Sequence, residues 1–246
     1  MALVQKFEKS NLFITMTCNL EWKEIQQLLH KAQRSRDRPD LKSRVFRTKL
    51  EDLKDQLFKK EIFGQVAAHV QIIELQKRGL PYAHMLIILK SEYKIVTLDD
   101  FDRIVYAELP NTHKFPELYN LVVKHMLHGP CGKKNGHNTC TVNEKCKYNY
   151  PRKFCNRSIQ EKDGYPIYGR RNDGKMVKVT RAMLNNQWNV LDDWCLLSRY
   201  DCHINVEVCL RVQAVKYLYK YIYKGHDRVA VYIAHTNRDN MIDEIY

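Results

Sequence analysis

The stretch GQVAAHVQIIELQKRGLPYAHMLIIL, residues 64–89, decides the fold. Residues 66–76 and 83–89 are rich in apolar and β-branched side chains, which is typical of strands. Gly79-Leu80-Pro81 lies between them and indicates a tight turn. Two strands joined by so short a connection predict an antiparallel hairpin in a central sheet.

The hairpin also carries polar residues that indicate a metal site. Tyr82 and His84 are two positions apart, so their side chains point to the same face of a strand. Glu74 lies on the preceding strand and is expected to meet His84 across the pair. A carboxylate and an imidazole on one sheet face are suited to Mg²⁺ or Mn²⁺. The alternative is a structural histidine with no metal.

The rest of the chain alternates between strand and helix patterns. We expect strands at 12–18, 203–209 and 228–235, helices at 21–30, 46–60, 98–105 and 115–127, a charged loop at 31–44, and turns with short strands at 163–190. Strands interleaved with helices, with neighbouring antiparallel pairs, predict an α+β fold in which helices flank a central antiparallel sheet.

A late segment, VKYLYKYIYKGHDR (residues 215–228), places two tyrosines four residues apart. At this spacing Tyr217 and Tyr221 share one face of a helix, with Lys220 and Lys224 beside them. Nearby ammonium groups favour the phenolate form of a tyrosine, and a phenolate can act as a covalent nucleophile. The alternative is a half-buried amphipathic helix in which the tyrosines only pack.

Residues 128–155 are rich in Cys, His, Gly and Lys and predict an irregular insertion. Too few apolar residues are present for this segment to fold by burying a core. Four residues could form a tetrahedral Cys₃His site for structural Zn²⁺: His128, Cys131, Cys140 and Cys146. Three others compete as ligands: Cys155, His125 and His137. The alternative is a loop with scattered cysteines.

Composition narrows the class of partner. Lysine and arginine outnumber the acids by 41 to 28 among 246 residues, a formal charge of +13. A charge of that size favours a polyanion, and nucleic acid is the usual one. A membrane partner is not expected, because no apolar run reaches the length of a membrane span. The start has no apolar signal core, so the eight cysteines predict a reducing compartment.

Five stretches of this sequence together resemble one known family. They are NLFITMTCNLEW (11–22), IELQKRGLPYAHMLIIL (73–89), KHMLHGPCG (124–132), DCHINVEVC (201–209) and AVKYLYKYIYKGHDR (214–228). In this order they are similar to the Helitron-like N-terminal domain, the Rep or HUH endonuclease part of Helitron rolling-circle transposase/helicase proteins. The resemblance spans nearly the whole chain.

The resemblance implies a fold and a reaction. HUH enzymes hold a metal with a His-hydrophobic-His motif on a central sheet strand, and a helix tyrosine attacks single-stranded DNA to give a 5′-phosphotyrosine and a free 3′-hydroxyl. Carried over, Tyr217 and Tyr221 would be the nucleophiles, supported by Lys220 and Lys224. His84 would be the second histidine of the motif and Glu74 the third ligand of Mg²⁺ or Mn²⁺.

The sequence departs from the family at Tyr82, where the family motif has its first histidine. A phenol with a pKa near 10 is a poor ligand compared with imidazole, so we expect impaired or absent nicking. Two other hypotheses remain: an inactive, basic DNA-binding remnant of a decayed transposon copy, and a zinc-stabilised interaction module with no nucleic-acid role. The charge and the matched stretches disfavour the latter.

The expected organisation is a single Rep domain over residues 1–246, a fragment that carries the Cys/His-rich insertion at about 128–155. The phosphate-binding motif GxxxxGK[ST] of a helicase is absent from the sequence, so neither ATP hydrolysis nor helicase activity is expected of these residues. The resemblance implies single-stranded DNA as the partner and the nucleus as the location.

Overall fold

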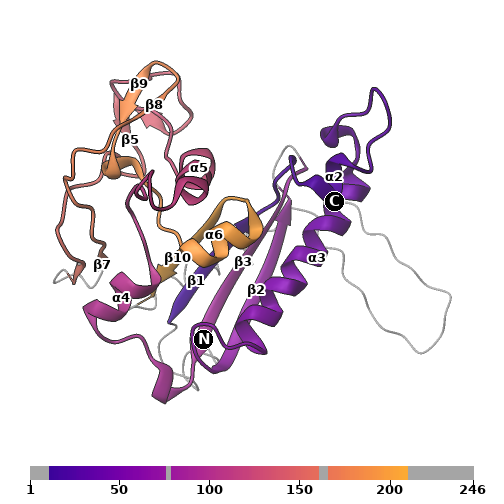
Figure 1. Ribbon diagram of the computed structural model, residues 1–246, viewed down its shortest axis with the longest axis horizontal. Coiled ribbons are helices and arrows are strands. Elements are labelled where there is room, and N and C mark those ends of the chain that lie inside the picture. Colours follow the sequence, from indigo (N-terminus) through magenta and orange to yellow (C-terminus); the bar gives the residue numbers. More distant parts are fainter. Residues whose placement is uncertain (1–10, 76–78, 161–165, 210–246) are drawn as a thin grey trace.

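The computed structural model describes residues 11–75, 79–160 and 166–209, which form an α+β structure around a four-stranded antiparallel sheet (Figure 1). The strand order is β10-β1-β3-β2. The sheet strands are β1 (Leu12–Thr17), β2 (Val66–Leu75), β3 (Pro81–Leu89) and β10 (Ile204–Val208). The predicted α+β class with a central antiparallel sheet is therefore confirmed.

The hairpin predicted from residues 64–89 is confirmed as β2 and β3. Glu74 lies directly opposite Tyr82, and Gly79 in the connection has a φ of +67°, a left-handed conformation that favours glycine. Strand β3 begins at Pro81, two residues earlier than expected. Proline is tolerated at the first residue of a strand because it lacks only the N–H, and the carbonyl of Pro81 accepts from Cys18 N at 3.0 Å.

One face of the sheet forms the main core. Ile14 pairs with Met85 on one side and Val206 on the other, and all three are fully buried. Helices α3 (Pro39–Phe58) and α6 (Trp194–Tyr200) pack on this face, and Figure 1 shows α3 running along β2 and β3. Their core residues include Phe46, Leu50, Leu53, Leu57, Leu196 and Leu197.

Two predictions for the segment before the hairpin are wrong. Residues 39–44 were expected in a loop, but α3 begins at Pro39, whose fixed φ suits the first turn of a helix. Leu41 is buried in that turn, so the helix gains core contacts that a charge count does not reveal. The helix expected at 21–30 is shorter, because α2 spans only Lys23–Gln26.

The helices expected at 98–105 and 115–127 are confirmed, whereas the strand at 159–160, the 3-10 turn at 91–93 and helix α6 were not predicted. The other helices are α4 (Leu98–Ile104), α5 (Pro116–His125) and three 3-10 turns, η1 (Ser35–Asp37), η2 (Ser91–Tyr93) and η3 (Asn186–Trp188). Three two-stranded sheets pair β4 (Thr141–Val142) with β5 (Lys145–Cys146), β6 (Ile159–Gln160) with β7 (Pro166–Ile167), and β8 (Val177–Val179) with β9 (Ala182–Leu184). The predicted irregular insertion at 128–155 contains only the β4–β5 hairpin.

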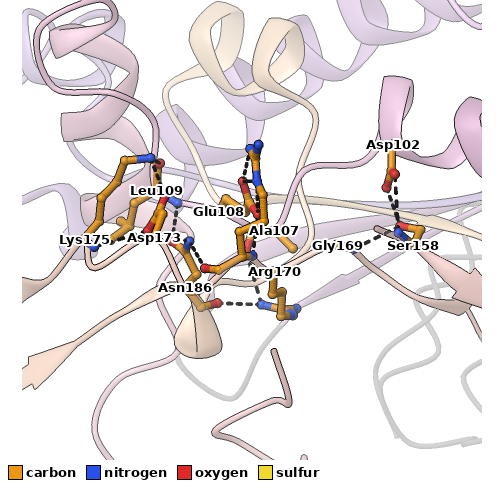
Figure 2. A network of polar contacts seen from close by, with 11 residues as sticks. Asp102, Ala107, Glu108, Leu109, Ser158, Gly169, Arg170, Asp173, Lys175 and Asn186 are labelled. Atoms are coloured by element: carbon orange, nitrogen blue, oxygen red, sulfur yellow. Dashed lines mark hydrogen bonds and ion pairs between the residues drawn. The ribbon is translucent and has the colours of Figure 1, made fainter. Parts of the chain in front are cut away.

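A buried arginine connects the segment that follows the insertion to the connection between α4 and α5 (Figure 2). Arg170 is buried, and its Nη1 donates to the carbonyls of Asn189 at 2.6 Å, Asn186 at 3.0 Å and Ala107 at 3.4 Å. Asn186 Oδ1 in turn accepts from Leu109 N at 2.8 Å. Because buried polar groups are costly to leave unpaired, these bonds favour one fixed arrangement of the two segments.

The predicted tyrosine helix at 215–228 and the strand at 228–235 lie outside the described residues, as does the turn at Asp163-Gly164. In the part of the chain that the structure describes, no helix is both long and apolar enough to cross a bilayer.

Candidate functional site

The second face of the sheet carries a group of polar side chains. His84 on β3 lies opposite Thr15 on β1, and Tyr82 lies opposite Thr17 on β1 and Glu74 on β2. Directly opposed residues of antiparallel strands share a face. The strand register therefore gathers hydroxyl, imidazole, phenol and carboxylate groups where a polar pocket can form.

One ring nitrogen of His84 is hydrogen-bonded, and the other faces a carboxylate. Its Nδ1 lies 3.0 Å from Thr15 Oγ1, and its Nε2 lies 3.7 Å from Glu74 Oε2. The ring also stacks on Phe13, with centroids 5.8 Å apart. Burial lowers the pKa of His84, which favours the neutral imidazole that metal ions require. When the proton is on Nδ1 and bonded to Thr15, the Nε2 lone pair faces the Glu74 side.

Tyr82 lies on the same face of the sheet as His84. The two rings are nearly parallel, with an interplanar angle of 18° and centroids 6.3 Å apart. Glu74, Tyr82 and His84 thus lie together, as the hairpin pattern predicted. Their roles as metal ligands stay a prediction. The donor set fits a divalent ion incompletely, because one carboxylate and one imidazole are good ligands and the phenol is a poor one.

The four predicted zinc ligands come together in a second cluster. His128 Nε2 lies 3.4 Å from the Sγ atoms of Cys131, Cys140 and Cys146, and all four ligand atoms lie within 4.8 Å of one another. In a tetrahedral site with the usual Zn–N and Zn–S bond lengths, nitrogen and sulfur are about 3.6 Å apart. The cluster could therefore hold a metal ion with little rearrangement.

Local structure explains how these ligands meet. His128 follows α5, and its backbone N donates to the carbonyl of Trp188 at 2.8 Å. Its ring stacks on Tyr150 at a centroid distance of 4.1 Å. Cys146 lies on β5, and its sulfur accepts from the backbone N of Tyr148 at 3.4 Å. Such N–H donors stabilise a thiolate.

The electrostatics of the cluster agree with a cation site. Burial, reinforced by a weaker effect of Arg152, lowers the pKa of His128, so its imidazole is neutral at pH 7. Burial and the two neighbouring thiols raise the pKa of Cys131 to about 12. Three adjacent thiols therefore do not all ionise by themselves, and a divalent cation would supply the charge that allows it.

The competing ligands do not join this cluster. His125 Nε2 contacts Asp201 Oδ1 at 2.7 Å, and Cys155 Sγ donates to the carbonyl of Arg157 at 2.7 Å. His137 is exposed. Among the described residues, the cluster of potential ligands contains only the four that were predicted.

The N-terminal part of the chain matches a known protein family. Residues 1–87 match the Helitron helicase-like domain at the N-terminus. The match contains β1, α3, β2 and most of β3, and therefore Glu74, Tyr82 and His84. The resemblance to the Helitron N-terminal domain is confirmed over these residues. No curated protein matches the chain.

The Helitron match covers 87 of the 246 residues. It includes the stretch at 11–22 and nearly all of the stretch at 73–89. The later stretches lie beyond it, so their assignment to the family stays a prediction. The predicted nucleophiles Tyr217 and Tyr221, with Lys220 and Lys224, lie outside the described residues.

Sequence reasoning missed Thr15, the residue that positions His84 within the Helitron-like segment. Thr15 and His84 are 69 residues apart, and only the β1–β3 register brings them together. The period of a strand places Thr15 on the face opposite to Ile14, but it does not say which strand lies beside it. A second pair, His125 and Asp201, was missed for the same reason.

Proposed function

We propose that this chain is the DNA-nicking and strand-transfer part of a Helitron-type transposon protein. The observation that carries the proposal is the position of His84, held between Thr15 and Glu74 on a central sheet face within the residues that match the Helitron family. The formal charge of +13 supports a nucleic-acid substrate.

In this proposal Glu74 and His84 would hold Mg²⁺ or Mn²⁺, and Thr15 would keep the imidazole in the correct tautomer. A bound divalent ion would neutralise charge on the scissile phosphate. The phenol of Tyr217 or Tyr221 gives its proton to water, the phenolate oxygen attacks phosphorus, the bond from phosphorus to O3′ breaks, and O3′ takes a proton from water. The products are a tyrosine ester of the 5′-phosphate and a free 3′-hydroxyl. Lys220 and Lys224 favour the phenolate.

Tyr82 limits this activity. It takes the place of the first histidine of the family motif, so the metal has two good protein ligands instead of three. We therefore propose that the wild-type chain nicks DNA weakly or not at all. Restoring the imidazole with Tyr82→His is expected to strengthen Mn²⁺ binding and to increase nicking.

The test is a covalent-adduct assay. Wild type and Tyr82→His are incubated with single-stranded DNA and Mn²⁺, and the DNA–protein adduct is mapped by mass spectrometry. The expected result is a stronger adduct at Tyr217 or Tyr221 in Tyr82→His. Tyr93→His, at an exposed tyrosine on η2, controls for adding a histidine. Equal and rapid cleavage by the wild type would show that the Tyr82 argument is wrong.

A second candidate is a basic remnant that binds single-stranded DNA without cutting it. The same residue favours it, because Tyr82 removes an imidazole from the proposed metal site. This candidate predicts that Tyr82→His binds DNA and yields no adduct. The first candidate predicts rescue, so one assay separates the two.

For the second cluster we propose structural Zn²⁺. Three sulfurs and one nitrogen at mutual distances close to those of a tetrahedral site favour zinc over Mg²⁺ or Mn²⁺, which prefer oxygen ligands. Native mass spectrometry that finds no zinc on protein expressed with zinc in the medium would exclude it.

A further inference from the structure

The segment around the Cys₃His cluster, residues 128–155, presents a strongly basic surface. We call this segment the Cys/His module and its six exposed cations the basic face: Lys133, Lys134, Lys145, Lys147, Arg152 and Lys153. The module contains a single acid, Glu144. None of the six cations forms an ion pair with an acid of the described residues. Their charge is therefore available to an external anion.

Exposed aromatic rings lie among these cations. Tyr148 is 53% exposed and Phe154 is 36% exposed. Lys147 Nζ lies 5.0 Å from the centroid of the Tyr148 ring. A ring exposed beside an ammonium group offers stacking and a phosphate contact at the same place. This combination is typical of surfaces that bind unpaired nucleotides.

The basic face is built on an ordered framework. Cys131, Cys140 and Cys146 are buried within the same module. Several hydrogen bonds fix the module to the segment that follows it: for example, Arg152 N donates to the carbonyl of Gln187 at 2.9 Å, and Lys134 Nζ donates to the carbonyl of Met183 at 2.9 Å. The backbone that carries these cations is thus held in place, which reduces the entropy lost when they bind a strand.

We propose that the basic face of the Cys/His module binds the backbone of single-stranded DNA, with Tyr148 stacking on a base. The proposal rests on the proposed function for the identity of the nucleic acid, because the strand to be nicked is single-stranded DNA. It adds a second contact with that strand, made by a different part of the chain from the sheet face that carries His84. Single-stranded DNA is favoured over duplex because the exposed rings need unpaired bases.

The test measures the affinity of the full chain, loaded with zinc, for a fluorescent oligonucleotide across a salt series. The basic-face variant is Lys145→Gln/Lys147→Gln/Arg152→Gln. Its matched control removes the same charge from exposed lysines outside the module: Lys23→Gln/Lys60→Gln/Lys114→Gln. Zinc content and melting temperature establish that both variants are folded.

The expected result follows from counterion release. Losing three phosphate contacts lowers the slope of log K against log salt by about 2 for single strands and weakens binding by about tenfold or more. The control variant keeps the wild-type slope. An unchanged slope in the basic-face variant, or an equal loss in the control, would overturn the proposal.

Tyr148 tests the stacking step. Tyr148→Ala is expected to weaken binding of single-stranded DNA by about tenfold, and Tyr148→Phe to preserve it. Equal losses on duplex DNA, or tighter binding of RNA of the same sequence, would overturn the assignment to single-stranded DNA. If DNA binding depends on the basic face but no covalent adduct forms, only the nicking function is contradicted. If the basic-face variant binds DNA normally and still forms the adduct, only this inference is contradicted.

Discussion

His84 Nε2 lies 3.7 Å from Glu74 Oε2, diagonally across the β2–β3 hairpin, while Thr15 contacts the opposite nitrogen of the same ring. The imidazole is therefore positioned from two neighbouring strands. A ligand fixed in this way loses little entropy when a metal binds.

The first prediction concerns Thr15, which holds His84 Nδ1 at 3.0 Å. Replacing it with valine removes the hydrogen bond and keeps the shape of the side chain. We expect Thr15→Val in a Tyr82→His background to weaken Mn²⁺ binding by about tenfold, because the ring tautomer is no longer fixed. Isothermal titration calorimetry with Mn²⁺ measures the effect.

Thr15→Ser in the same background provides the matched control. It keeps the hydroxyl that contacts His84 Nδ1 and removes only a methyl group. Thr15→Ser is therefore expected to keep the Mn²⁺ affinity of the Tyr82→His chain. Equal losses in the two variants would show that the Thr15 hydrogen bond does not orient a ligand.

The second prediction concerns the Cys/His module. Cys140→Ser removes one of three sulfurs from the cluster around His128, and we expect loss of bound zinc and a lower melting temperature. Cys195→Ser is the control, because Cys195 is exposed and lies outside the cluster. A chelator should lower the melting temperature of the control and have little further effect on Cys140→Ser. If the chelator leaves the melting temperature of the wild type unchanged, the cluster does not hold structural zinc.

Short-range patterns in the sequence predicted much of this structure. The β2–β3 hairpin followed from apolar runs around a Gly-Pro turn, and the cluster at His128 followed from the spacing of its cysteines. What could not be predicted depends on long-range register. Thr15 meets His84 only after β1 inserts beside β3, and Arg170 meets Ala107 only after the segment that follows the insertion has folded back. No local pattern encodes these distances.

The third prediction uses the contact between α3 and α6. The Arg199 guanidinium donates to Asp52 at 2.8 and 2.9 Å and lowers the pKa of that carboxyl to about 2. A lowered pKa stabilises the fold when the carboxylate is charged. The stabilisation is complete above the unfolded value, near 3.9, and disappears as the pH falls through about 2. Because both side chains are more than one-third exposed, Asp52→Asn should cost only about 1 kcal/mol at pH 7. Urea unfolding at pH 7 and at the lowest pH where the chain folds measures the difference, which should shrink in acid.

The last prediction concerns Asp192, a fully buried carboxyl whose two oxygens accept no hydrogen bond from the described residues. Burial and then the charge of Asp193 raise the pKa of Asp192 well above its usual value, and Arg170 opposes this only weakly. The folded chain therefore keeps this carboxyl protonated at a pH where the unfolded chain ionises it. Ionisation then favours the unfolded state, so stability falls as the pH rises above about 4, by up to about 1.4 kcal/mol per pH unit until the folded pKa is reached.

Asp192→Asn removes this titration and keeps the size of the side chain. We expect the variant to be less sensitive to pH than the wild type between about pH 4 and 7 and to gain stability relative to it as the pH rises. Asp99→Asn, at an exposed position in the first turn of α4, controls for the loss of one negative charge. Urea unfolding at several pH values gives the free energies. If the free energy of unfolding depends on pH in the same way for Asp192→Asn and the wild type, Asp192 is ionised in the folded chain. The buried carboxylate would then need a partner that the described residues do not supply.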